Sequence, residues 1–258
     1  MSRAASGKRP SLPEFTRGVR AIAARELGTY FDSAIAYVYT IAFAVLANSV
    51  FMNEFFLAGT ADMRGWFERM PLFFAVFLPA VSMRLWAEER RQRTIEPLLT
   101  LPIVPLQAVL GKYAAALALL GVFLASSLPI VIMLVALGSP DLGQIASGYL
   151  GLIGLGALLL AAGALLSALS ADQIVAFVAA SLAAFALVLS GEPRVVAVLD
   201  GLAPALAAGT HLRDTLSAMP HFEAFLAGSV TLAAALYFLL FSALCLWTNA
   251  LVLARARS

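Results

Sequence analysis

Long runs of apolar residues recur along this chain, and they leave little room for a fold outside a membrane. Hydrophobic residues make up 62% of the 258 residues and charged residues only 12%, against roughly 45–50% apolar and about 25% charged residues in soluble domains. A run of about 20 apolar residues can cross a bilayer as a helix. The composition therefore predicts an all-α polytopic membrane protein, a single transmembrane domain over residues 1–258 with no sizeable soluble part.

Six apolar runs predict six transmembrane helices. They lie at residues 34–56, 71–87, 113–137, 145–169, 173–190 and 230–253. Pro79 predicts a kink in the second span, and the fifth span, which ends before Gly191, could instead be a short or re-entrant segment. With six spans, most of the 17 Lys and Arg residues fall on one side. The positive-inside rule then places both termini in the cytoplasm.

Residues 11–31 form an amphipathic segment ahead of the first span. Its apolar face consists of Leu12, Phe15, Val19 and Ile22. This pattern predicts an interfacial helix that leads into the membrane. Glu26 lies on the line of the apolar face, and we expect it to pair with a basic residue of the same region such as Arg84 or Arg90. A carboxylate that snorkels to the interface is the alternative.

The segment SMRLWAEERRQRTIEPLLTLP, residues 82–102, concentrates charge between two apolar runs. Each of its central charges would cost roughly 2.5–3.5 kcal/mol at mid-membrane, so the preceding helix must end near Trp86. Residues 87–112 then form the one sizeable cytosolic loop. Beyond the charges, polar and apolar residues at helical spacing favour a short amphipathic helix that binds a partner, with a bend at Pro97.

This loop is the candidate docking site for a cytosolic protein. The polar contacts are predicted to be Glu88, Glu89, Arg90, Arg91, Thr94 and Glu96, and the apolar anchor Ile95, Leu98 and Leu99. Apolar side chains that fill a groove supply most of the energy of such contacts. The simpler alternative is that these charges only fix the topology of the loop.

Two patterns in the sequence resemble known motifs, a membrane-protease motif and a phosphate-binding loop, but each lacks residues that the complete motif requires. Glu88-Glu89 followed by Arg93 resembles the first motif of CAAX-processing membrane proteases, but neither His211 nor His221 has a phenylalanine four residues before it. We therefore reject the protease interpretation.

Gly111-Lys112 resembles the end of a phosphate-binding loop. That motif needs Gly at position 106, which is leucine, and Ser or Thr at position 113, which is tyrosine. The lone Cys245 and two distant histidines offer no metal-ligand spacing. We expect no catalytic residue, metal or cofactor on this chain.

Three segments of the chain resemble the type-2 ABC exporter permeases, and within them the GldF-type, gliding-motility-like branch. They are residues 24–39 (ARELGTYFDSAIAYVY), residues 83–103 (MRLWAEERRQRTIEPLLTLPI) with Gly111-Lys112, and residues 221–239 (HFEAFLAGSVTLAAALYFL). The chain departs from the family pattern at Arg93, where glycine is usual, at Pro97, where leucine is usual, and at Ala227, where arginine is usual. The first two departures bear on the helix geometry of the charged segment.

The resemblance implies a non-catalytic permease subunit in the bacterial cytoplasmic (inner) membrane. Its expected partners are a cytoplasmic ABC ATPase subunit, which would hold ATP and Mg and bind the loop at 87–112, and a second permease copy or sister permease. An auxiliary extracytoplasmic subunit and membrane lipid are further expected partners. Residues 191–229 would form an extracytoplasmic loop or re-entrant helices that close the outer end of the path.

Two other functions stay open from the sequence. ATP-driven membrane work without transport, such as support of surface motility, shares every feature described above. An ATP-independent secondary carrier would show inverted repeats and charged residues at the midplane, and the sequence shows neither. Nucleic-acid binding is not expected, because 17 basic residues are nearly balanced by 15 acidic ones.

Overall fold

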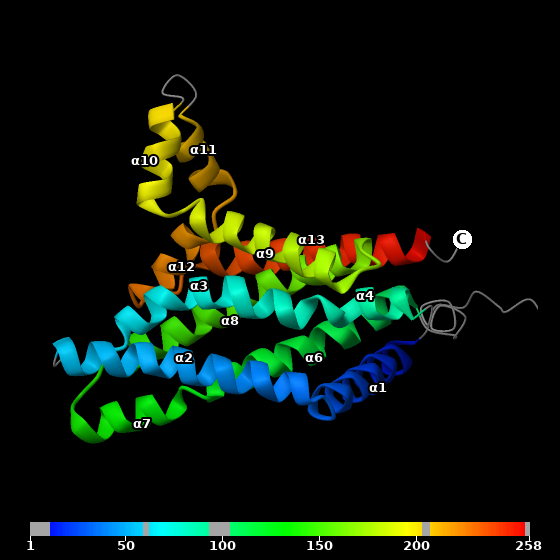
Figure 1. Ribbon diagram of the computed structural model, residues 1–258, viewed down its shortest axis with the longest axis horizontal. Coiled ribbons are helices and arrows are strands. Elements are labelled where there is room, and N and C mark those ends of the chain that lie inside the picture. Colours follow the sequence, from blue (N-terminus) through cyan, green and yellow to red (C-terminus); the bar gives the residue numbers. More distant parts are fainter. Residues whose placement is uncertain (1–10, 59–61, 93–103, 203–206, 256–258) are drawn as a thin grey trace, which may run out of the picture.

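The computed structural model describes residues 11–58, 62–92, 104–202 and 207–255, and every regular element in these ranges is an α-helix (Figure 1). The helices are α1 (Leu12–Phe31), α2 (Ala34–Ala58), α3 (Arg64–Ser82), α4 (Arg84–Arg91), α6 (Pro105–Ala125), α7 (Leu128–Leu137), α8 (Leu142–Leu169), α9 (Gln173–Leu189), α10 (Pro193–Leu202), α11 (Ala208–Thr215), α12 (Met219–Leu226) and α13 (Leu232–Arg255). The prediction of an all-helical fold is confirmed for the described part of the chain.

Several helices are long and apolar enough to cross a membrane. Five stretches among the described residues meet this test: Ala36–Leu57, Arg64–Arg91, Pro105–Leu137, Leu142–Leu169 and Leu232–Arg255. The helices α9 and α10 meet it only together and are bent by 90° at their junction, so the count is six if this pair is one span. The multi-pass character is therefore confirmed. The fifth predicted span, at 173–190, is the one whose helix does not meet the test by itself.

Two predicted spans are longer than expected and carry a break. The span predicted at 71–87 begins at Arg64 and runs through Pro79, and its break falls at Met83, between α3 and α4. The span predicted at 113–137 begins at Pro105 and breaks between α6 and α7. There Ser126 Oγ donates to the Phe123 carbonyl at 2.6 Å, a back-bond that often bends helices.

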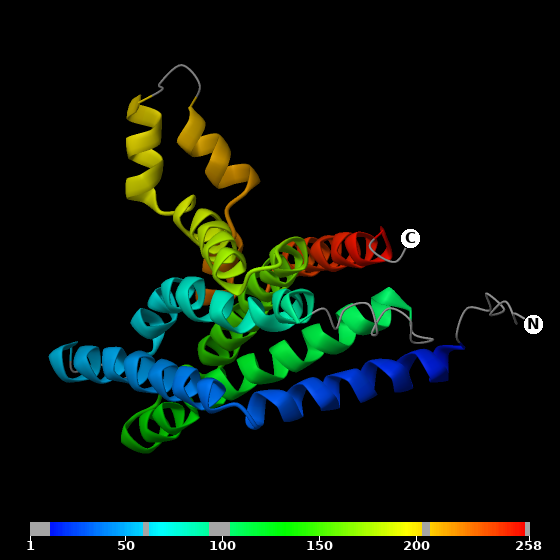
Figure 2. The same ribbon diagram turned by 45° about the vertical axis from the view of Figure 1, so that its right-hand side comes forward.

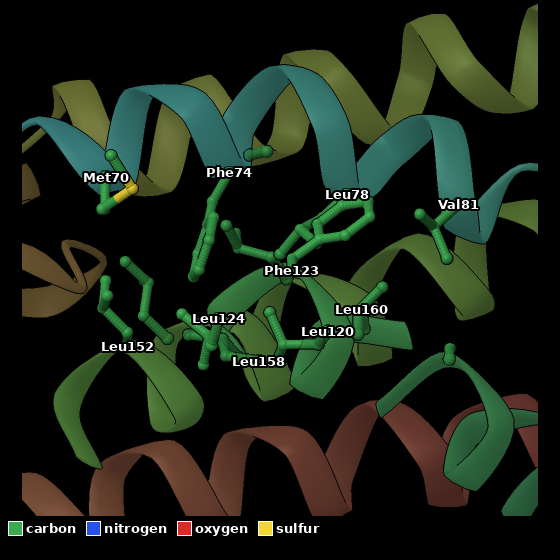
Figure 3. Packing of buried hydrophobic residues seen from close by; sticks show 14 of the residues in the cluster. Met70, Phe74, Leu78, Val81, Leu120, Phe123, Leu124, Leu152, Leu158 and Leu160 are labelled. Atoms are coloured by element: carbon green, nitrogen blue, oxygen red, sulfur yellow. The ribbon is translucent and has the colours of Figure 1, made fainter. Parts of the chain in front are cut away.

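The core forms around α8, which contacts α3, α4, α6, α9, α12 and α13. Figure 3 shows Phe74 and Leu78 of α3 meeting Phe123 of α6 and Leu158 of α8. Two glycines let α8 approach its neighbours closely. A Cβ on Gly151 would lie 2.8 Å from Phe225 Cβ, and a Cβ on Gly156 would lie 2.6 Å from Leu120 Cδ2. Such distances leave no room for a methyl group.

Three short helices, α10 to α12, occupy the described part of residues 191–229. The helices α10 and α11 pack on each other and project from the bundle in both views (Figures 1 and 2). Asp200 joins them, because its Oδ1 accepts from the Gly209 and Thr210 amides at 2.7 and 3.1 Å. The start of α1 and the end of α13 lie at the opposite end of the long axis from α7. Which end faces the cytoplasm stays a prediction.

Candidate functional site: a buried ion network beside the charged helix

The charged segment begins as a well-defined helix, α4, that continues α3 after a break at Met83. Leu85, Trp86 and Ala87 are buried, whereas Arg91 at its end is exposed. The expectation that residues 87–112 form a loop is therefore wrong at both ends, because α4 extends to Arg91 and α6 begins at Pro105. The helix persists because its apolar face packs on the bundle, and of its last charged residues only Arg91 is exposed.

The first turn of α4 is capped by a side chain from another helix. Met83 stands at the N-cap position and offers no side-chain acceptor. Ser167 Oγ of α8 accepts hydrogen bonds from the Trp86 and Ala87 amides, both at 3.1 Å, and donates to the Met83 carbonyl at 2.8 Å. A hydroxyl cap is worth about 1 kcal/mol to a helix. Ser167 therefore fixes where α4 starts and ties it to the centre of the bundle.

A buried lysine of α6 holds the other side of α4. Lys112 is the one buried charged residue among those the structure describes, with 3% of its side chain exposed. Its Nζ lies 3.1 Å from Glu26 Oε1 of α1 and 2.9 Å from Glu89 Oε1 of α4. The same Nζ lies 5.0 Å from the centre of the Trp86 ring, within the range of a cation–π contact.

Arg25 completes this cluster at the surface. Its Nη2 lies 2.9 Å from Glu26 Oε1 and 3.7 Å from Glu89 Oε1, and about half of its side chain is exposed. We call Arg25, Glu26, Glu89 and Lys112 the Lys112 network. Its two positive and two negative charges balance, which is the condition under which buried ions persist. The Lys112 network joins α1, α4 and α6.

Further polar contacts hold α1 against the break between α3 and α4. The Tyr30 hydroxyl donates to the Val81 carbonyl at 3.3 Å, and Arg84 Nη1 donates to Ser33 Oγ at 3.3 Å. Burial raises the pKa of Tyr30, so this phenol stays protonated and keeps its donor. Arg84 also pairs with Glu88 at 3.2 Å.

The helix α1 packs along α6 (Figure 2). Gln107 Nε2 donates to the Phe15 carbonyl at 3.2 Å, and a Cβ on Gly111 would lie 2.7 Å from Ile22 Cβ. The Val19 carbonyl lies 3.0 Å from the same point. From Phe15 onward, the predicted apolar face is half-buried and packs in part on α6, and the interfacial position of α1 stays a prediction.

The predicted docking residues differ in their surroundings. Glu89 turns inward to Lys112, whereas Glu88 pairs with Arg84 and accepts from Gln92, and Arg91 is exposed. Arg90 is half-buried. The remaining predicted contacts lie outside the described residues: Thr94, Ile95, Glu96, Leu98 and Leu99.

The pairing expected for Glu26 exists but with other partners. The prediction named Arg84 or Arg90, and the structure pairs Glu26 with Arg25 and Lys112. Sequence reasoning missed Lys112 because it was assigned to the end of a loop. A signal was present, since this lysine begins an otherwise apolar run (KYAAALALLG) and a charge in that setting requires a partner.

Comparison with known proteins assigns no family. No protein-family model matches the sequence, and no curated protein matches it. Within the described residues, no three His, Cys, Asp or Glu side chains gather in a way that could hold a metal ion. The Lys112 network and the charged helix are therefore the features from which a function can be inferred.

Proposed function

We propose that this chain is the membrane permease subunit of an ATP-binding cassette exporter of the type-2 class, similar to the GldF-type branch. It would hydrolyse no ATP itself and would couple to a separate cytoplasmic ATPase through α4 and the residues that follow it. The observation that carries this proposal is the Lys112 network, which fastens the charged helix to two other helices.

Fastening matters because a partner that changes shape can move a membrane helix only through a rigid connection. A push on α4 reaches α3 across the break at Met83, α6 through Lys112 and α1 through Glu26. It also reaches α8 through Ser167. A charge run that served only to fix topology would need none of these long-range contacts, so they favour coupling over simple anchoring.

The proposal also assigns roles to a second permease copy and to the helices α10 to α12. A second permease copy or a sister permease would complete the path, and α10 to α12 would close its far end. ATP-driven membrane work without transport, such as support of surface motility, would use the same coupling. A secondary carrier is disfavoured because the buried lysine lies near the start of α6, in the turn that faces charged α4, whereas such a carrier would hold its charges at the midplane.

The first experiment is co-purification of the tagged chain from its native membrane in mild detergent, with mass spectrometry and an ATPase assay. We expect a protein with Walker motifs to be recovered with the wild-type chain. Glu88→Lys should abolish this recovery, because it reverses a charge on the proposed docking surface.

Glu68→Lys is the matched control. Glu68 also forms an i,i+4 pair with an arginine, Arg64 Nε at 3.0 Å, but it lies at the opposite end of the same span. Recovery of the ATPase with this variant and its loss with Glu88→Lys would support the proposal. Equal recovery with both variants would refute the docking role, and recovery of the chain alone would favour an autonomous carrier.

A further inference from the structure

The last helix, α13, buries a side-chain amide that nothing in the described chain satisfies. Asn249 is 0% exposed, and its Oδ1 and Nδ2 are both shielded from solvent without a hydrogen-bond partner among the described residues. Its neighbours on the same face of α13, Leu246 and Leu253, are buried apolar residues of the core. A buried amide without hydrogen bonds destabilises a fold, so this residue requires an explanation.

Asn249 differs from other shielded polar residues of the described chain. Asn48 of α2 leaves only its Oδ1 unpaired, because its Nδ2 donates to the Ser126 carbonyl at 3.1 Å. Ser181 of α9 leaves a single hydroxyl unpaired, and a helical serine can donate to its own backbone after rotation about one bond. Among the described residues, Asn249 is the one whose side chain leaves two polar atoms unsatisfied.

The same face of α13 carries a second buried polar residue. Ser242 precedes Asn249 by two helical turns, a distance of about 10 Å along the axis. The hydroxyl of Tyr113 on α6 lies beside Ser242 and donates to the Ala157 carbonyl of α8 at 2.9 Å. Polar side chains therefore occur where α13 packs on α6 and α8. We call Tyr113, Ser242 and Asn249 the α13 seam.

The two halves of α13 are held differently. In the first half, Phe238 packs closely on Gly154 of α8, where an added Cβ would lie 2.8 Å from Phe238 Cδ2. The Tyr237 hydroxyl donates to the Leu216 carbonyl at 3.0 Å. The rest of the helix carries the polar groups of the α13 seam. Separation of that second half from α6 and α8 would therefore expose groups that water can satisfy, whereas separation of the first half would break close packing.

The α13 seam lies towards the end of the bundle that holds the charged helix. The end of α13 and the end of α4 lie at the same end of the long axis (Figure 1). Asn249 is about 9 Å along the helix from Arg255, the last residue of α13. Under the proposed function this end faces the cytoplasm, so a polar solute could reach Asn249 from there without crossing the apolar centre of the bundle.

We infer that the α13 seam is a binding site for neutral hydroxyl or amide groups of the transported molecule, closed in this structure and opened when the second half of α13 separates from α6 and α8. Amide and hydroxyl side chains donate and accept hydrogen bonds without carrying charge, so they suit neutral polar groups. Residues that break the packing rules of a fold are expected at functional sites. This inference rests on the proposed permease function and specifies the chemistry of one part of its path.

Cysteine labelling in inside-out membrane vesicles tests the inference. The one native cysteine, Cys245, is replaced by alanine in the background chain. Asn249→Cys should react with neutral hydroxyethyl methanethiosulfonate roughly tenfold faster than Leu160→Cys, because only the thiolate reacts and a thiol shut in an apolar core stays protonated. Leu160 of α8 is the matched control, since it is also 0% exposed and lies in the core cluster of Figure 3.

The same assay tests the neutral character of the site. Rates for Asn249→Cys are compared between the hydroxyethyl reagent and its positively charged trimethylammonium counterpart, each divided by its rate with free cysteine. We expect the neutral reagent to be faster, because no member of the α13 seam carries a charge that would compensate a bound ion.

Thermal unfolding of the purified chain in mixed micelles is the second measurement. Asn249→Leu should raise the unfolding midpoint by about 2 °C or more, because it removes an unsatisfied amide from the closed form. Asn48→Leu is the matched control. It loses the 3.1 Å bond to the Ser126 carbonyl and should not raise the midpoint.

The outcomes separate this inference from the proposed function. Equal labelling of Asn249→Cys and Leu160→Cys would overturn it. A lower midpoint for Asn249→Leu would overturn it too, because the amide would then be satisfied in the closed form by a permanently bound water. Faster labelling by the charged reagent would refute the neutral class of ligand. Recovery of the ATPase without this labelling would leave the permease function standing, and labelling without an ATPase would leave the site standing without that function.

Discussion

Replacement of Lys112 by methionine should destabilise the fold by about 3 kcal/mol. Removing one member of a buried ion pair costs about 3–5 kcal/mol, because the remaining charge stays buried without compensation. Lys112 has two carboxylate partners, at 2.9 and 3.1 Å. In the variant, Arg25 still pairs with Glu26 at 2.9 Å and lies 3.7 Å from Glu89. Glu89 therefore loses more of its compensating charge than Glu26 does. Because Arg25 compensates both carboxylates in part, we expect the lower end of the range of about 3–5 kcal/mol.

The assay is equilibrium unfolding of the purified chain in mixed micelles, with Arg64→Met as control. That variant also removes a cation from a carboxylate, but both side chains are more than half exposed, so it should cost no more than about 0.5 kcal/mol. Adding Glu89→Gln to Lys112→Met should recover about 1–2 kcal/mol, because the half-buried carboxylate that lost its nearest cation is then neutral. Equal losses for Lys112→Met and Arg64→Met would refute the reasoning.

Three further predictions concern single contacts. Ser167→Ala should cost about 1 kcal/mol and speed hydrogen exchange of the first amides of α4, with unchanged exchange contradicting the cap. Gly111→Ala should push α1 away from α6 and cost about 1–3 kcal/mol in the same unfolding assay. Gly121→Ala should not destabilise the fold, because a Cβ added there would meet no atom within 4 Å. Burial lowers the pKa of His221 from 6.5, and its ring stacks on Tyr237 at 4.0 Å. The unfolded chain then binds the proton more readily, so thermal stability should fall as pH drops below about 6.5, and His221→Phe should abolish this fall.

The membrane-spanning helices could be predicted because their signal is local. An apolar run of sufficient length can be recognised without knowing which residues pack against it. Five of the six predicted runs overlap helices that are long and apolar enough to span a membrane. Breaks were harder to predict. Pro79 is the obvious helix breaker, yet α3 continues to Ser82 and the break falls at Met83. There Ser167 caps the next helix, which no local side chain does.

The Lys112 network could be predicted only in part because its members are far apart in sequence. Glu26 was recognised as a charge in need of a partner, but the sequence argument named Arg84 or Arg90 and could not rank them against Lys112. The choice of Lys112 depends on how α1 docks on α6, and that in turn depends on the missing side chain at Gly111. Neither fact is expressed in hydrophobic periodicity.

The cap on α4 has a consequence for how the chain is made. Ser167 follows Trp86 by 81 residues, so at synthesis rates of about 5–20 residues per second the charged helix waits roughly 4 to 16 seconds for its cap. During that interval the Trp86 and Ala87 amides lack the acceptor that Ser167 provides in the folded chain. The contact that fixes the charged helix is therefore completed only after α8 has been inserted, and a chain cut short before α8 would reach the membrane with α4 still uncapped.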